Sequence, residues 1–191
     1  MAKLGEPDGA ASDESLVARA VVGDERAFTT LVDRHQDRLF RFLRFALQVE
    51  RAEAEDLAQE IFIQVHRALP SFEGRSRFQT WLFGIAKNIC RRRGSHPCWS
   101  PDAQADDGAL LDVPDQQLDP LAMLERHQVQ NVVRGAIDSL SPLHRAVVFL
   151  RDIDGLTYDE IAQALDLPVG TVRSRLHNAR ARLAVRLLGT R

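Results

Sequence analysis

The stretch LPVGTVRSRLHNARARLAVRLL, from Leu167 to Leu188, decides the fold expected for the C-terminal part of the chain. Pro168 and Gly170 interrupt the preceding pattern, and Thr171 is a good helix N-cap. Apolar residues then recur at spacings of three and four, which predicts one apolar stripe along a helix: Val172, Leu176, Ala179, Leu183 and Leu187. We therefore expect a turn followed by an amphipathic helix.

The other sides of this helix carry short polar groups and arginine. The positions predicted to point away from the stripe are Ser174, His177, Asn178 and Ala181, and those on its flanks are Arg173, Arg175, Arg180 and Arg182. No acidic residue occurs from Thr171 onwards, whereas this segment holds six arginines. Such a helix suits the major groove of DNA. An ordinary solvated basic face has the same pattern, so the neighbouring sequence must decide.

The residues before this helix favour DNA binding. Thr157-Tyr-Asp-Glu160 has the capping-box pattern and starts a short helix that we expect to end near Leu165. A turn of about four residues with a glycine follows, as in helix-turn-helix units. Ile161 and Leu165 can then pack on Val172. The spacing predicts a helix-turn-helix whose second helix is basic.

Helical periodicity also dominates the rest of the chain. Ser12 can cap one helix, Asp24 the next, and Ser141 another that has Pro142 at its first position. His35 falls within an apolar stripe and is interpreted as a packed core histidine. The further helices are expected at about 12–22, 24–47, 52–68, 77–93, 121–138 and 141–151.

Charge is unevenly distributed along the 191 residues, although the net charge is only −2. Residues 95–120 contain six aspartates, several prolines and neither lysine nor arginine. This composition is typical of a flexible acidic linker. The sequence therefore predicts an all-α protein of two small helical domains, with a tail at 1–11, a first domain at 12–94, the linker at 95–120 and a second domain at 121–191.

Several classes of protein are disfavoured. Two cysteines cannot build a disulfide framework, and Cys90, His96 and Cys98 lack a fourth metal ligand nearby, so we interpret the thiols as incidental and expect no metal. The sequence has no signal-peptide-like start and no run of about 18 apolar residues, so we expect a chain that is not inserted in a membrane. No nucleophile–base pair or phosphate loop emerges, so neither enzyme chemistry nor a cofactor is expected.

Aromatic and cationic residues alternate between about 72 and 93. Phe72, Phe78, Trp81 and Phe83 lie beside Arg75, Arg77, Lys87 and Arg91 to Arg93. Proteins that bind single-stranded nucleic acids use aromatic rings to stack on bases and cations to bind phosphates. Phe78 and Trp81 are better explained as core, which leaves the loop 72–76 and the cations as candidate contacts.

Five motifs resemble the extracytoplasmic-function (group IV) sigma factors of bacterial RNA polymerase. They occur in one order over nearly the whole chain: DLAQEIF at 56–62, FEGRSRFQTWL at 72–82 with IAKN at 85–88, LSPLHRAV at 140–147, GLTYDEIA at 155–162 and GTVRSRL at 170–176. The resemblance implies that the first domain is a sigma-two-like four-helix domain and the second a sigma-four-like helix-turn-helix domain. It also implies a cytoplasmic initiation factor that acts only with core polymerase.

The resemblance assigns a role to each group of residues. The beta-prime clamp helices would bind Asp56, Gln59, Glu60, Phe62 and Ile63. The −10 promoter element would be opened and held by Phe72, Arg75, Ser76, Arg77, Lys87, Asn88, Arg91 and Arg92. The −35 element would be read by Thr171, Arg173, Ser174, Arg175, His177, Asn178, Arg180 and Arg182, with His177 and Asn178 at positions that vary in the family and tune sequence preference.

Further partners are implied in the same way. The polymerase beta flap would bind the second domain, and a cognate anti-sigma factor, in this family often membrane-anchored, would hold the chain inactive until an envelope or stress signal. The linker would run through the RNA-exit region of the polymerase, where it either mimics nucleic acid or serves as a solubilising spacer.

Two other classes of function remain open at the level of sequence. One is a stand-alone helix-turn-helix regulator, against which the residues 56–62 argue. The other is a helical enzyme that uses Cys90, His96 and Cys98, which has little support.

Overall fold

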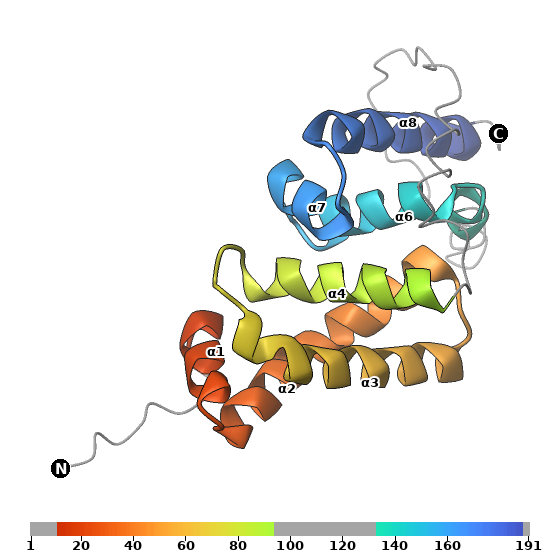
Figure 1. The fold of residues 1–191 in the computed structure, drawn as a ribbon. Helices are drawn as coiled ribbons and strands as arrows, with labels where there is room; N and C mark the ends of the chain where they lie inside the picture. Colours follow the sequence, from red (N-terminus) through yellow and green to blue (C-terminus); the bar gives the residue numbers. More distant parts are fainter. Residues whose placement is uncertain (1–10, 94–132, 189–191) are drawn as a thin grey trace.

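The computed structural model describes residues 11–93 and 133–188, and every regular element in these two ranges is a helix. Figure 1 shows the helices in layers, with α2 and α3 below α4, α7 and α6 above α4, and α8 on top. The predicted all-α fold with two helical regions is confirmed.

The first region contains α1 (Asp13–Val21), α2 (Glu25–Phe42), α3 (Arg51–Ala68) and α4 (Phe78–Arg92). Two predicted caps are present, because the Ser12 side chain accepts from Ser15 N–H and the Asp24 side chain accepts from the N–H groups of Arg26 and Ala27. Gly23, at φ +94°, makes the left-handed turn between α1 and α2 that other residues rarely adopt. The predicted helices are therefore confirmed to within a residue or two at their starts.

The end of α2 has a feature that the sequence pattern did not reveal. Its last turn, Leu43–Leu47, is a π-helix, and Gln48 ends it in the left-handed conformation. A short 3₁₀ turn, Leu69–Ser71, similarly follows α3. These endings leave carbonyl oxygens that helical hydrogen bonds do not satisfy.

The core of the first region is built from the apolar faces of these helices. The largest fully buried side chains include Phe42, Phe83, Leu31, Leu57 and Ile61. His35 is 2% exposed, with its Nε2 2.8 Å from Asp13 Oδ2, so it ties α1 to α2. The interpretation of His35 as a core histidine is confirmed.

The second region begins with a helical turn at 133–138 and continues with α6 (Pro142–Val148), a π-helix (Phe149–Ile153), α7 (Tyr158–Leu165) and α8 (Val169–Leu188). The capping box is confirmed: Thr157 accepts from Glu160 N–H, and Glu160 accepts from Thr157 N–H. The remaining residues expected in the helix at 121–138 lie outside the described ranges, as do the tail and the linker. Val133, in the described turn of this helix, is 39% exposed.

Two predicted caps differ from the structure. The last helix begins at Val169, so Thr171 lies in its first turn, and Val172 N–H already donates to Pro168 O at 3.1 Å. Proline favours this start because its ring presets φ and it has no N–H to leave unpaired. Ser141 precedes α6 as predicted, but its Oγ lies 2.6 Å from His144 Nδ1 and bonds no backbone N–H of the helix.

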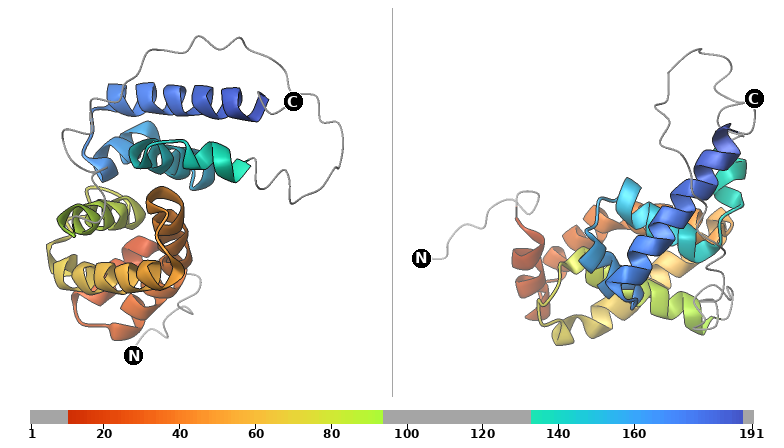
Figure 2. Two further views of the ribbon diagram at one scale, coloured as in Figure 1. Left: turned by 90° about the vertical axis from the view of Figure 1, so that its right-hand side faces the viewer. Right: turned by 90° about the horizontal axis from the view of Figure 1, so that it is seen from above.

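The two regions pack against each other, with α4 of the first against α7 of the second, as the left view in Figure 2 shows. The apolar cores are continuous, since the Phe149 ring lies 5.6 Å from that of Phe42 and 5.5 Å from that of Phe45. The buried Arg145 donates from Nε to Ala46 O at 3.0 Å and from a terminal nitrogen to Leu140 O at 2.5 Å. One guanidinium therefore satisfies a carbonyl of the π-helical end in one region and a turn in the other.

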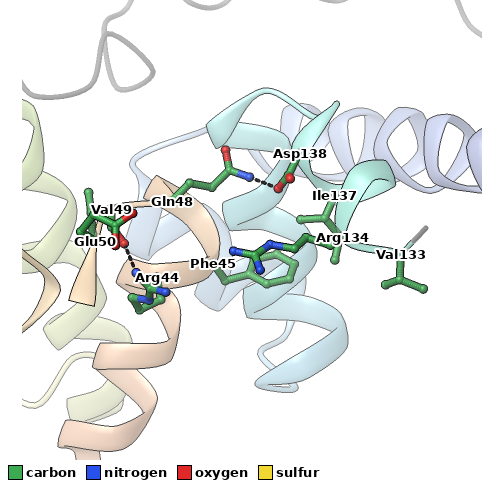
Figure 3. Close-up of a pocket in the computed structure, with 9 residues that line it drawn as sticks. All are labelled: Arg44, Phe45, Gln48, Val49, Glu50, Val133, Arg134, Ile137 and Asp138. Atoms are coloured by element: carbon green, nitrogen blue, oxygen red, sulfur yellow. Dashed lines mark hydrogen bonds between the residues drawn. The ribbon is translucent and has the colours of Figure 1, made fainter. Parts of the chain in front are cut away.

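A cleft of about 640 Å³ opens at one side of this contact (Figure 3), between the π-helical end of α2 and the helical turn at 133–138. Gln48 reaches across it to donate to the Asp138 carboxylate, while Arg44 donates to Val49 O within the first region.

A buried carboxylate lies near the other side of the contact. The Asp154 side chain is 3% exposed, with Arg38 Nε 3.5 Å away and the Gln79 amide donating to it. Burial raises the pKa of Asp154 above its ordinary value of 3.8, and the attraction of Arg38 and Gln79 offsets this only in part. At neutral pH the ionised carboxylate therefore opposes folding.

This pKa shift predicts how stability depends on pH. A raised pKa means that the contribution of Asp154 to stability is fully present below pH 3.8 and is lost as the pH rises through the folded-state value. Asp154→Asn keeps the shape and removes the charge, so the variant should melt at a higher temperature than the parent at about pH 7, with the advantage shrinking as the pH falls toward 3.8. Thermal unfolding followed by circular dichroism measures both. A less stable variant at neutral pH would mean that the Arg38 ion pair outweighs burial.

Candidate nucleic-acid and protein interfaces

The first candidate interface is an apolar groove of about 550 Å³ between α2 and α3, called here the α2–α3 groove. Phe28, Val32 and Phe40 line it from α2, and Ala58, Phe62 and Ile63 from α3. Its rim is polar and contains both charge signs, from Gln36, Asp37, Arg51, Glu55, Gln59 and His66. A groove with an apolar floor and a polar rim suits an amphipathic helix of a partner.

The five residues predicted to bind the polymerase divide over two faces of α3. Gln59, Phe62 and Ile63 line the α2–α3 groove, whereas Asp56 and Glu60 do not, and the Glu60 carboxylate pairs with Arg93. Phe62 is only 9% exposed, because its ring packs into the core, while Ile63 is 46% exposed at the groove edge. The sequence motif, which lies within α3, therefore missed the contribution of α2, whose Phe28 and Val32 line the other side of the groove.

The second candidate interface is a pocket of about 600 Å³ between α1 and the loop before α4, called here the α1–loop pocket. The loop residues from Phe72 to Phe78 form one wall, and Glu14, Val17, Ala18 and Val21 of α1 form the other. Phe72 is half-buried, and its ring lies 4.8 Å from that of Trp81. Arg75 is exposed and pairs with Glu73 at 2.5 Å. The sequence motif at 72–82 gave no indication that α1 forms one wall of this pocket.

The cations of α4 do not all face solvent. Asn88, Arg91 and Arg92 are exposed. Arg77, just before α4, is exposed but holds Glu160 at 3.2 Å. Lys87 was expected to be exposed, yet it is 8% exposed because α7 covers it, and its Nζ lies 3.7 Å from Asp166 Oδ2. Burial lowers the pKa of Lys87, and Asp166 opposes this effect.

The third candidate interface is the outer face of α8. Arg173, Ser174, His177 and Arg180 are exposed on it, and Thr171 and Arg182 are half-buried. Residues of the neighbouring helices contact two of the exposed arginines. The Arg173 guanidinium lies 5.9 Å from the centre of the Tyr158 ring in α7, and Arg180 Nε donates to Asp152 of the π-helix at 3.2 Å. Ser174 Oγ donates to Thr171 O at 3.1 Å.

Three residues predicted on the outer sides of this helix are buried. Arg175 is 2%, Asn178 8% and Ala181 6% exposed. The expected single stripe was too narrow, because α8 packs on both α6 and α7 and so buries a wider arc than one neighbour would require. Of the residues predicted to read the −35 element, Arg173, Ser174, His177 and Arg180 are exposed.

Metal and membrane features were also considered. Cys90 is buried in α4, while His96 and Cys98 lie outside the described residues. Within 11–93 and 133–188 no three His, Cys, Asp or Glu side chains group as a metal site would require. None of the helices in these ranges is long and apolar enough to cross a membrane.

Comparison with known protein families places both regions. The model of sigma-70 region 2 matches residues 31–94, and that of sigma-70 region 4 matches residues 130–183. The chain is 37% identical over 180 residues to the ECF RNA polymerase sigma-E factor of Escherichia coli K12, with 88% of this chain and 91% of the relative covered. It is 36% identical over 176 residues to the sigma-E factor of Haemophilus influenzae, with 88% and 92% covered.

Solved structures agree with these matches. CnrH, in complex with the cytosolic domain of CnrY, superposes with a TM-score of 0.67 at 27% identity, covering 94% of this chain and 99% of CnrH. The sigma factor RpoE of Bartonella quintana, in complex with the anti-sigma factor NepR, gives a TM-score of 0.57 at 25% identity, with 85% and 96% covered. The chain belongs to the extracytoplasmic-function sigma factors of the sigma-70 family, which are transcription initiation factors rather than enzymes.

Burial separates the roles of two neighbouring arginines. Arg175→Ala removes a large buried side chain and should lower the free energy of unfolding by about 2–4 kcal/mol. Arg173→Ala removes an exposed side chain and should change it by no more than about 0.5 kcal/mol. Urea unfolding of both variants measures the difference. Equal losses would place Arg175 at the surface and restore the predicted orientation of the helix.

Proposed function

We propose that this chain is a promoter-specificity subunit that binds core RNA polymerase in the bacterial cytoplasm and directs it to a distinct set of promoters. The observation that carries the proposal is the presence of both sigma regions, in order, in a chain similar over 88% of its length to sigma-E factors. The three interfaces then divide the work between the polymerase and two promoter elements.

The α2–α3 groove is the proposed docking site for the polymerase. A clamp helix of the beta-prime subunit would lay apolar side chains on Phe62 and Ile63 and satisfy its polar flanks with Gln59 and the groove rim. Asp56 and Glu60, on the neighbouring face of α3, would add acidic groups suited to a basic partner. The second region would bind the beta flap.

The α1–loop pocket is the proposed receptor for a base of the −10 element. Moving a base out of the duplex stack costs a few kcal/mol of free energy. Stacking and hydrogen bonds in a fitted pocket can offset this cost. Phe72, Arg75 and Ser76 stand at the pocket wall, and Asn88, Arg91 and Arg92 extend along α4 as a track for the strand backbone. Arg77 and Lys87 would join this track once α7 is displaced.

The outer face of α8 is the proposed reader of the −35 element in duplex form. Arg173, Ser174 and His177 project from the N-terminal half of the recognition helix, which is the part that contacts base edges in helix-turn-helix proteins. Arg180 and the half-buried Arg182 lie further along and suit phosphate contacts.

An anti-sigma factor is the proposed regulatory partner. CnrH and RpoE, which share this fold, were each solved with a partner: CnrH with the cytosolic domain of CnrY, RpoE with the anti-sigma factor NepR. By analogy, an anti-sigma factor, membrane-anchored or free, would bind this chain and keep it from polymerase.

Run-off transcription with purified core polymerase on a genomic promoter library tests the function. The chain should produce transcripts from promoters that core enzyme alone does not use. Ile63→Glu places a charge at the edge of the apolar groove and should weaken core binding at least about tenfold and remove these transcripts. Val22→Glu changes an equally apolar, 82% exposed residue outside the groove and should leave both unchanged. No promoter-dependent transcript with the parent chain would overturn the proposal.

Arg173→Ala tests the reading face. If the guanidinium contacts a base edge, the substitution should cost about 1–3 kcal/mol on the preferred −35 sequence and little on others. Binding of the chain to duplexes that differ at single −35 positions, in the presence of core enzyme, measures the difference. An equal loss on every sequence would make Arg173 a phosphate contact and remove it from specificity.

A further inference from the structure

The α1–loop pocket is formed by two separate elements, so its width depends on how they are held together. Val17 and Val21 of α1 belong to one wall, and the residues from Phe72 to Phe78 form the other. Figure 1 shows α1 beside the turn and loop that lead into α4. Because the shape of a pocket sets which base it accepts, a shift of α1 relative to the loop would change that choice.

One buried side chain contacts the elements behind both walls. His35 of α2 is 2% exposed, and its Nε2 lies 2.8 Å from Oδ2 of Asp13, the first residue of α1. Its ring lies 5.2 Å from the ring of Phe78, which is the first residue of α4 and lines the pocket. His35 therefore connects α1 to the start of α4.

The Asp13 carboxylate fixes the beginning of α1 on α2. Its Oδ1 accepts from Arg34 at 2.6 Å, while its Oδ2 faces His35. Arg34 also donates to Ala11 O at 3.0 Å, one residue before the N-cap of α1. Both oxygens of Asp13 are thus in use, so α1 cannot shift along α2 without loss of charge-assisted hydrogen bonds.

The protonation state of His35 follows from its surroundings. Burial lowers the pKa of His35 below its ordinary value of 6.5, Asp13 opposes this effect, and the positive charges of Arg38 and Arg34 add to it. Nδ1 is buried and has no hydrogen-bond partner among the described residues. A neutral ring with its proton on Nε2 fits both observations, because it donates to Asp13 and leaves no buried N–H unpaired.

The Phe78 ring belongs to a cluster of three aromatic rings behind the loop wall. It is 3% exposed and lies 6.4 Å from the ring of Phe72 and 6.0 Å from that of Trp81. The rings of Phe72 and Trp81 are 4.8 Å apart. Because Phe72 and Phe78 both line the pocket, the cluster that packs on His35 shapes the loop wall.

We propose that His35 is a positioning residue of the α1–loop pocket, which sets the separation of the two walls and thereby the base that the pocket accepts. His35 is not among the residues that line the pocket, so it acts through Asp13 on one wall and through Phe78 on the other. This inference rests on the proposed function, because it takes the pocket as the receptor for a base of the −10 element.

Three variants separate the two contacts of His35. His35→Gln keeps a donor for Asp13 in its amide nitrogen but removes the ring that packs on Phe78. His35→Phe keeps a ring against Phe78 and removes the donor. Asp13→Ala breaks the same link to α1 from a side chain that is 23% exposed, so it should act like His35→Phe without a change in the core.

The control variant is Val65→Ala, which removes buried methyl groups from α3. Val65 is fully buried and does not line the pocket. This variant reports what loss of core packing does by itself, away from both walls.

The probes are promoter fragments selected in the run-off experiment that carry each of the four bases in turn at every −10 and −35 position. Transcription by core polymerase with each variant gives a selectivity ratio at each position, the transcript from the preferred base over that from the other three. Loss of folded chain lowers all transcripts equally, so it leaves these ratios unchanged.

The three variants at His35 and Asp13 should lower the selectivity ratio at one −10 position by about three- to tenfold, because a small shift of a pocket wall weakens discrimination. The −35 ratios should stay at the parent values, and Val65→Ala should change no ratio. Parent −10 ratios in any of the three variants would overturn the proposal. A loss that extends to the −35 ratios, or an equal loss in Val65→Ala, would overturn it as well.

Failure here is distinct from failure of the proposed function. A parent chain that transcribes from specific promoters, while the variants keep its −10 ratios, would contradict only the positioning role of His35. A parent chain without promoter-dependent transcripts would overturn the proposed function, and with it the inference that rests on it.

Discussion

The contact between α4 and α7 is the constraint on which the rest of this structure depends. It joins two helical regions into one body, buries Lys87, and leaves α8 facing outward. The continuous core through Phe149 and the bonds from Arg145 to the carbonyls of Ala46 and Leu140 hold the regions at this angle. The groove between α2 and α3 lies on the opposite side of α4, so closure of the two regions does not fill it.

Opposite charges serve two purposes in this arrangement. The cations at α4 suit a nucleic-acid strand, yet Arg77, Lys87 and Arg93 already have carboxylate partners within the chain. Such pairing does not fully compensate the burial of Asp154, because desolvation raises the pKa of this carboxyl more than Arg38 and Gln79 lower it. The Glu160 and Asp166 side chains are less deeply buried than that of Asp154.

Much of the fold could be predicted from local sequence, whereas the site could be predicted only in part. Ser12, Asp24 and the box from Thr157 to Glu160 act within a few residues, so their patterns predicted helix starts correctly. Arg175, Asn178 and Lys87 were misplaced because their exposure depends on which helices pack beside α8 and α4. The contributions of α1 and α2 to the two pockets could not be predicted, because apolar residues that line a groove have the same helical spacing as residues of a core.

The central claim is that one chain carries the polymerase-docking groove and the faces that contact both promoter elements. A cryo-electron microscopy structure of the chain bound to core polymerase and promoter DNA tests it most directly. The account predicts a beta-prime clamp helix in the α2–α3 groove, the non-template strand of the −10 element at the α1–loop pocket, and the outer face of α8 in the major groove of the −35 element. A complex in which the clamp helices bind away from the α2–α3 groove, or in which the outer face of α8 does not face DNA, would contradict it.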